Sequence, residues 1–192
     1  TLKKENLNKS IRIIKEKKFK QEKLKKILKE QIKKNKFKKA IIVTPTKTHY
    51  KISKEFIKNS IPIILEKPAG FNVLEVKKMI KLSKKFKSSV IVNHSDLYNE
   101  EFNFILNKIN LIGKINFVEA DFGKFDNTYK DKNYLPFYDW LPHPLAILFL
   151  IAKNLYNPTI EYNKIIKKNG SFFQDIIISL KSSNIKLIRI RY

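Results

Sequence analysis

Three polar side chains have the types and positions needed to move a proton. Lys67 directly follows a short apolar segment, within Glu66-Lys67-Pro68, and Asp139 and His143 stand four residues apart in Tyr138-Asp139-Trp140-Leu141-Pro142-His143. A general base that takes the proton of a hydroxyl must lie within about 3 Å of the hydroxyl oxygen. Histidine titrates near neutrality and can accept that proton, and a lysine can share the task if its surroundings lower its pKa.

Asp139 and His143 allow more than one interpretation. If their segment is helical they share a face, where the carboxylate could orient the imidazole or hold a substrate hydroxyl. They could also be two ligands of a metal ion, although the spacing suggests no third ligand. His143 lies between two prolines and could simply end a loop.

The other two histidines also allow more than one interpretation. His49 could be a structural residue at the start of its helix or a contact to a cofactor. His94-Ser95-Asp96 contains the three residue types of a serine-hydrolase triad, but adjacent residues rarely converge on one point, which disfavours that chemistry.

Alternating apolar segments and amphipathic segments predict the elements that position these residues. Short apolar strands are expected at 11–14, 40–43, 61–65 and 90–92, and helices at 21–34, 53–59, 73–86 and 100–110. Short, uniformly apolar strands separated by helices predict an α/β fold with a parallel sheet covered on both faces. Ligands of such sheets bind beyond the carboxyl ends of the strands, which is where Lys67 falls.

The pattern changes after Gly113. A strand is expected at 115–122, then a loop with Tyr129 and Tyr134, a helix at 142–155, and strands at 159–167, 171–181 and 185–191. Asn169-Gly170 is a strong signal for a two-residue hairpin turn. We therefore predict two domains, residues 1–112 and 113–192, the second of α+β class with a mainly antiparallel sheet.

Composition limits the classes of partner. The 192 residues include 41 basic and 17 acidic side chains, for a net charge of +24, but only three are arginine and none is cysteine. Lysines occur on every predicted helix and no nucleic-acid motif is present, which favours a solvated surface over specific nucleic-acid binding. The alternative function is a non-catalytic basic protein that binds nucleic acid or another anionic partner. The chain lacks an apolar run of about 18 residues, and we expect no membrane segment and a cytoplasmic location.

Five motifs occur in the order found in one enzyme family. They are the TPxxxH segment at 44–49, EKP at 66–68, Val92-Asn93-His94, the turn at Gly113, and the DWxPH segment at 139–143. Over about residues 37–152 the chain resembles the Gfo/Idh/MocA family of NAD(P)-dependent sugar oxidoreductases. The first domain would then be an incomplete dinucleotide-binding, Rossmann-like domain, and the second an incomplete substrate-binding and dimerisation domain.

The resemblance implies hydride transfer between NAD or NADP and a hydroxyl-bearing carbon of a sugar, cyclitol or nucleotide-sugar. It implies no metal, a small-molecule substrate, and a homo-oligomer at full length. The catalytic residues it implies are Lys67, Asp139 and His143. The cofactor-binding residues it implies are Thr44, Pro45, Thr46, His49, Glu66, Lys67 and His94.

One family feature is missing. The four glycines form no G-x-G-x-x-G, the turn whose backbone approaches the cofactor pyrophosphate. Counted back from the TP turn, that fingerprint would lie upstream of residue 1. We therefore expect this chain to be an internal fragment that lacks the first βαβ unit and the end of the substrate domain. Whether it binds cofactor by itself is left open.

Overall fold

The computed structural model describes residues 21–123 and 135–192, which fall into two compact units. Of the described residues, the first unit holds 21–65 and 70–91, and the second holds 66–69, 92–123 and 135–192. The strand predicted at 11–14 and the loop predicted around Tyr129 and Tyr134 lie outside the described residues. The predicted domain boundary between residues 112 and 113 stays a prediction.

The first unit is built on a three-stranded sheet in the order β1-β2-β3. Strands β1 and β2 are parallel, with Ala40 opposite Ile63, as the α/β pattern predicted. Its elements are α2 (Gln21–Asn35), β1 (Ala40–Ile42), α3 (Thr46–Lys58), β2 (Ile63–Glu66), α4 (Val73–Phe86) and β3 (Val90–Asn93). The last residues of β2 and β3 already belong to the second unit.

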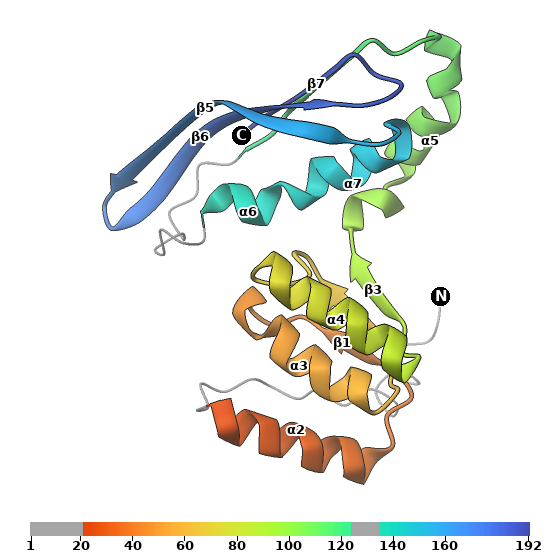
Figure 1. Ribbon diagram of the computed structural model, residues 1–192, viewed down its shortest axis with the longest axis vertical. Coiled ribbons are helices and arrows are strands. Elements are labelled where there is room, and N and C mark those ends of the chain that lie inside the picture. Colours follow the sequence, from red (N-terminus) through yellow and green to blue (C-terminus); the bar gives the residue numbers. More distant parts are fainter. Residues whose placement is uncertain (1–20, 124–134) are drawn as a thin grey trace. The chain divides into compact units, whose positions relative to one another are not determined.

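Helices cover one face of this sheet. The three strands lie in the sheet in their sequence order. Since crossovers between parallel strands are right-handed, α3 and α4 lie on the same side of the sheet (Figure 1). Side chains on that side are buried, Ile42 and Ile63 among them, whereas Ile41 is 70% exposed and Ile64 41%. The prediction of a sheet covered on both faces is therefore wrong for the described residues, because uniformly apolar strands do not reveal which side their helices take.

Local sequence explains where the helices begin. Helix α3 starts at Thr46, well before the predicted residue 53, because Pro45 at its N-cap holds a φ of −56° that a helix can follow. Helix α4 has the predicted bounds. There the Asn72 side chain accepts a 3.0 Å hydrogen bond from the backbone N–H of Glu75, and the Glu75 carboxylate accepts one from the N–H of Phe71.

The second unit carries a four-stranded sheet in the order β4-β7-β6-β5. The β4–β7 pair is parallel and the other two pairs are antiparallel, so the predicted mainly antiparallel sheet is confirmed. The helix predicted at 142–155 ends earlier, and a short helix, α6, precedes it where a loop was expected. The elements are η1 (Ser95–Tyr98), α5 (Glu100–Lys108), η2 (Ile109–Ile112), β4 (Phe117–Asp121), α6 (Pro136–Trp140), α7 (Pro142–Ile151), β5 (Tyr156–Lys168), β6 (Ser171–Lys181) and β7 (Leu187–Arg191).

The core of the second unit lies between its sheet and the helices α6 and α7 (Figure 1). Phe137 and Leu148 from the helices pack with Ile178, Ile188 and Ile190 from the strands, and all five are less than 9% exposed. This packing holds α6 and α7 against the sheet, and with them the polar residues that they carry.

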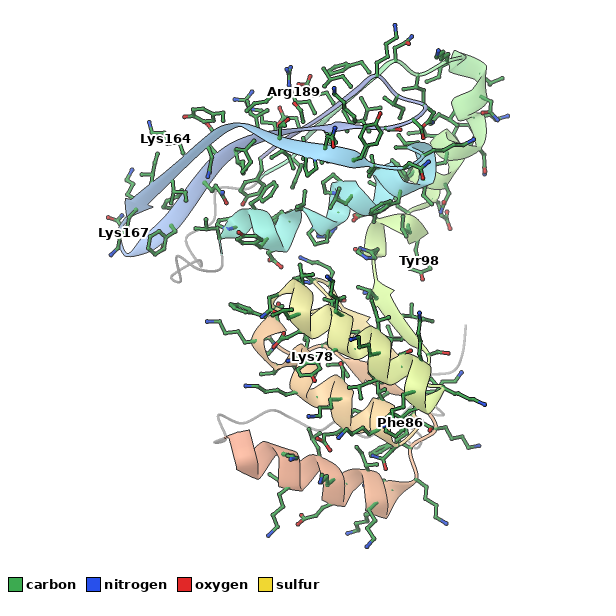
Figure 2. The ribbon with its side chains drawn as sticks, in the orientation of Figure 1. Lys78, Phe86, Tyr98, Lys164, Lys167 and Arg189 are labelled. Atoms are coloured by element: carbon green, nitrogen blue, oxygen red, sulfur yellow. The ribbon has the colours of Figure 1, made fainter. Side chains whose placement is uncertain are left out.

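The opposite face of the same sheet is polar in its centre. Arg189, on the side away from α6 and α7 (Figure 2), donates a 3.1 Å hydrogen bond to Glu161, which also accepts one from Ser179. The hydrogen bond from Ser179 is the main cause of a lowered pKa at Glu161. The three residues join β5, β6 and β7. Among the described residues, no helix is long and apolar enough to cross a membrane.

Candidate active site

The carboxyl ends of β2 and β3 are joined by a side-chain hydrogen bond. Asn93 Nδ2, at the end of β3, donates to Glu66 Oε1 at the end of β2 over 2.6 Å, and Glu66 Oε2 accepts the backbone N–H of Lys67 at 3.2 Å. The Lys67–Pro68 peptide bond is cis. Lys67 therefore leaves the sheet from a backbone position that both strands hold.

The ammonium of Lys67 binds Asp139 of α6. Lys67 Nζ donates to Asp139 Oδ1 and to the Asp139 carbonyl oxygen, each over 3.0 Å. The two side chains are 19% and 30% exposed, so the ion pair is partly shielded from water. Lys67 Nζ also lies 5.8 Å from the centroid of the Trp140 ring. Two residues 72 positions apart in sequence thus form one polar cluster with an aromatic wall.

The imidazole of His143 lies on the same indole. The His143 and Trp140 ring centroids are 5.6 Å apart, so Trp140 contacts both the lysine and the histidine. His143 Nδ1 is hydrogen-bonded to the Asp96 carboxylate, which η1 supplies. The carboxylate bonded to the imidazole is thus that of Asp96, whereas Asp139, on α6, pairs with Lys67.

His94, which precedes η1, belongs to the same cluster. Its Nδ1 is buried and has no hydrogen-bond partner in the described parts of the chain, and the same holds for the indole Nε1 of Trp140. Burial lowers the pKa of His94 below 6.5, and the nearby charge of His143 lowers it further. Its surroundings therefore favour the uncharged ring of His94.

The remaining predicted cofactor residues lie in the first unit, around the start of α3. His49 is 1% exposed, and its Nε2 lies 2.6 Å from the carbonyl oxygen of Thr44. Thr48 Oγ1 donates to Thr44 Oγ1 or to the Pro45 carbonyl, each at 2.8 Å. These contacts support the structural interpretation of His49. Cofactor contacts by His49 and by the Thr44–Thr46 turn stay predictions.

The structure thus brings five of the predicted residues into the second unit: Glu66, Lys67, His94, Asp139 and His143. Sequence reasoning missed Asp96 and Trp140 as members of this cluster. Trp140 could have been found within the DWxPH motif, whereas Asp96 was noticed only as part of His94-Ser95-Asp96. The structure pairs it with a histidine 47 residues away. Among residues 21–123 and 135–192, no group of three or more His, Asp or Glu side chains is placed so that it could hold a metal ion.

Comparison with known proteins agrees with the motifs. A family model described as "Oxidoreductase family, NAD-binding Rossmann fold" matches residues 4–94. The matched domain is the NAD-binding domain of the Gfo/Idh/MocA family, the family that the motifs resemble. A search of curated protein sequences gives no significant match.

Several solved structures share the fold. An oxidoreductase from Bacillus cereus aligns with a TM-score of 0.68 at 20% identity, over 84% of this chain and 48% of its own. Biliverdin reductase from Synechocystis, solved with biliverdin and NADP⁺, gives 0.71 at 15% identity, over 86% and 55%. A Sinorhizobium meliloti protein assigned as a myo-inositol dehydrogenase gives 0.72 at 18%, over 85% and 53%. The chain therefore spans about half the length of these structures.

The second-unit cluster has donors that suit the nicotinamide end of the family's cofactor. The buried indole N–H of Trp140 can only donate a hydrogen bond, and a buried donor without a partner costs about 1–3 kcal/mol. An amide or hydroxyl oxygen of a bound molecule would satisfy it. For the pyrophosphate the fit is poor, because the four glycines of this sequence form no glycine-rich turn.

Proposed function

We propose that the protein is an NAD(P)-dependent oxidoreductase that acts on a hydroxyl-bearing carbon of a sugar, cyclitol or nucleotide-sugar. The bound cofactor would supply the hydride acceptor or donor. The cluster of Lys67, Asp139 and His143 would bind the reacting hydroxyl and handle its proton. The observation that carries the proposal is the ion pair between Lys67 and Asp139 next to the indole that also contacts His143.

His143 is the general base of this proposal. Its Nδ1 is engaged by Asp96, which leaves Nε2 to accept the proton of the substrate hydroxyl. In the reverse direction the same nitrogen returns the proton to the carbonyl oxygen. A general base placed in this way accounts for about 10²–10⁴-fold in rate.

Lys67 has a different task, because one donor of its ammonium is left for the substrate once two are bonded to Asp139. Two contacts go to Asp139, and an ammonium has three donors in all. Lys67 would donate to the substrate oxygen and stabilise the negative charge that develops there, while Asp139 fixes the ammonium in place. Trp140 and His94, with buried ring nitrogens that lack partners in the described residues, would hold polar groups of the cofactor or substrate.

The test is turnover of NAD(P)H over a panel of sugars and cyclitols, with the full-length product of the gene and a Lys67→Met variant. Methionine keeps the length of the side chain and removes the ammonium. We expect kcat to fall by about 10²–10⁴-fold, since both charge stabilisation and hydroxyl positioning are lost.

Lys78→Met is the matched control. Lys78 lies on the exposed side of α4, in the other unit (Figure 2), and its loss should leave kcat within about twofold of wild type, as expected for a surface side chain. Equal turnover by wild type and Lys67→Met would reject the role of Lys67. Absence of turnover with every substrate and both cofactors would reject the oxidoreductase.

A further inference from the structure

The contact between Asp96 and His143 carries a second, finer inference. Asp96 lies on η1 and His143 near the start of α7, and the imidazole Nδ1 bonds to the Asp96 carboxylate within the second unit. We propose that Asp96 is a positioning residue that fixes the tautomer and the ring orientation of His143. This inference rests on the proposed function for its catalytic consequence, but its structural part can be tested separately.

The tautomer follows from hydrogen-bond chemistry. An ionised carboxylate can only accept hydrogen bonds, so the bond to Asp96 requires the proton to be on Nδ1 of His143. A neutral imidazole carries one proton, and Nε2 is then left with its lone pair. Without Asp96 the proton of the ring could lie on Nε2. Nε2 would then have no free lone pair and could not accept the substrate proton.

The orientation follows from what surrounds the ring. The Asp96 carboxylate holds one edge and the Trp140 indole lies 5.6 Å away, centroid to centroid. Backbone hydrogen bonds hold η1 itself: Leu97 N donates to the His94 carbonyl at 3.1 Å, and Asn99 N to the Asp96 carbonyl at 3.2 Å. The carboxylate is therefore presented from a short ordered turn rather than from a loose loop.

Other charged groups of this cluster have partners of their own. Lys67 is bonded to Asp139, and Glu66 is bonded to Asn93. Burial lowers the pKa of His94, and a positive charge on His143 lowers it further, so a second positive charge is disfavoured beside His143. Asp96 is thus the carboxylate that the structure assigns to the imidazole.

The first experiment reads the tautomer directly. Long-range ¹H–¹⁵N spectra of the 192-residue chain at pH 8 separate the two tautomers of each ring, and the chain has only three histidines. We expect His143 in the Nδ1–H form. Asp96→Ala should shift it toward the Nε2–H form and Asp96→Glu should restore the Nδ1–H form. Glu101→Gln, which removes an exposed acid from α5, should change nothing.

Either of two results would overturn the inference. One is His143 in the Nε2–H form in the wild-type chain, a measurement that does not depend on any variant folding. The other is an unchanged Nδ1–H signal in Asp96→Ala.

The second experiment links the tautomer to catalysis in the full-length protein. Asp96→Ala should lower kcat by about 100-fold with KM within about threefold, because the base is misplaced while substrate contacts remain. An unchanged kcat would overturn the positioning role. If wild type and all variants were inactive, the proposed function would fail, while the tautomer spectra would still decide whether Asp96 orients His143.

Discussion

At the scale of single residues, the second unit holds two imidazoles in contrasting surroundings. His143 has a carboxylate partner, whereas His94 is half-buried, with a buried Nδ1 that no described residue satisfies. A positive charge on His94 would be desolvated and would repel a charge on His143. The lowered pKa of His94 therefore favours an uncharged ring, which can donate or accept a hydrogen bond without adding charge to the cluster.

The lowered pKa of His94 predicts a loss of stability in acid. Because the unfolded chain binds a proton at His94 more readily than the folded chain, the free energy of unfolding falls as pH drops below 6.5, and continues to fall until the folded pKa is passed. A His94→Gln variant should lose less stability between pH 7.5 and pH 5. Urea unfolding at the two pH values measures this, and an NMR titration of His94 with its midpoint at or above 6.5 would contradict it.

At the scale of elements, patterns in the sequence predicted the long helices and strands better than the short segments between them. The bounds of α4 and β6 were predicted correctly, because caps and turn residues near their ends are local signals. Helix α6 was not predicted, since its five residues are too few for a periodic pattern and its place depends on Phe137 packing into the core. Local signals thus fix the ends of elements, whereas packing decides what short segments do.

In the candidate site, too, local signals predicted some residues and tertiary packing decided the others. Lys67, Asp139 and His143 could be named from motifs, but nothing local couples a carboxylate on η1 to a ring 47 residues further on. Asp96 became visible only when β3 and α7 brought the two segments together. Contacts of this kind depend on tertiary structure and cannot be predicted from the spacing of residues in the sequence.

The hairpin between β5 and β6 gives an element-scale prediction. Asn169 and Gly170 have φ values of 50° and 76°, and a Cβ added at Gly170 would meet no atom within 4 Å. Gly170→Ala should therefore destabilise the chain by about 1–2 kcal/mol through backbone conformation alone, because alanine disfavours positive φ. Asn169→Gly, which keeps this conformation allowed, should stay within about 0.5 kcal/mol of wild type. Urea unfolding of both variants gives the comparison, and equal effects would contradict the explanation.

At the scale of the whole molecule, charge is the dominant property. A groove of about 480 Å³ between α2 and α3 is lined by five lysines, Lys25, Lys29, Lys33, Lys54 and Lys58, but by only one acid, Glu55. With a net charge of +24 and a groove of like charges, the folded chain repels itself. Salt shortens the range of this repulsion to about 8–10 Å at physiological strength.

Neutralising one groove lysine should therefore stabilise the chain. We expect Lys29→Gln to raise Tm by about 1–3 °C in low salt, and the gain to shrink at 0.3 M NaCl, where the charges are already screened. Lys164→Gln is the control, because Lys164 lies opposite Asp175 in the β5–β6 register, near the hairpin turn (Figure 2). Thermal unfolding at both salt concentrations tests this, and a gain for Lys164→Gln that equals the gain for Lys29→Gln would contradict it.

The one-sided helix cover of the β1-β2-β3 sheet has a practical consequence. Among the described residues, Ile41, Ile64 and Ile91, one from each of the three strands, form an exposed apolar strip on the folded first unit. Dyes such as ANS, which fluoresce on apolar surface and are commonly used to detect loosened proteins, can bind such a strip. A bright dye signal from this chain is therefore no measure of disorder, and its folding is better followed by near-ultraviolet circular dichroism, to which Trp140 and its neighbouring aromatic rings contribute.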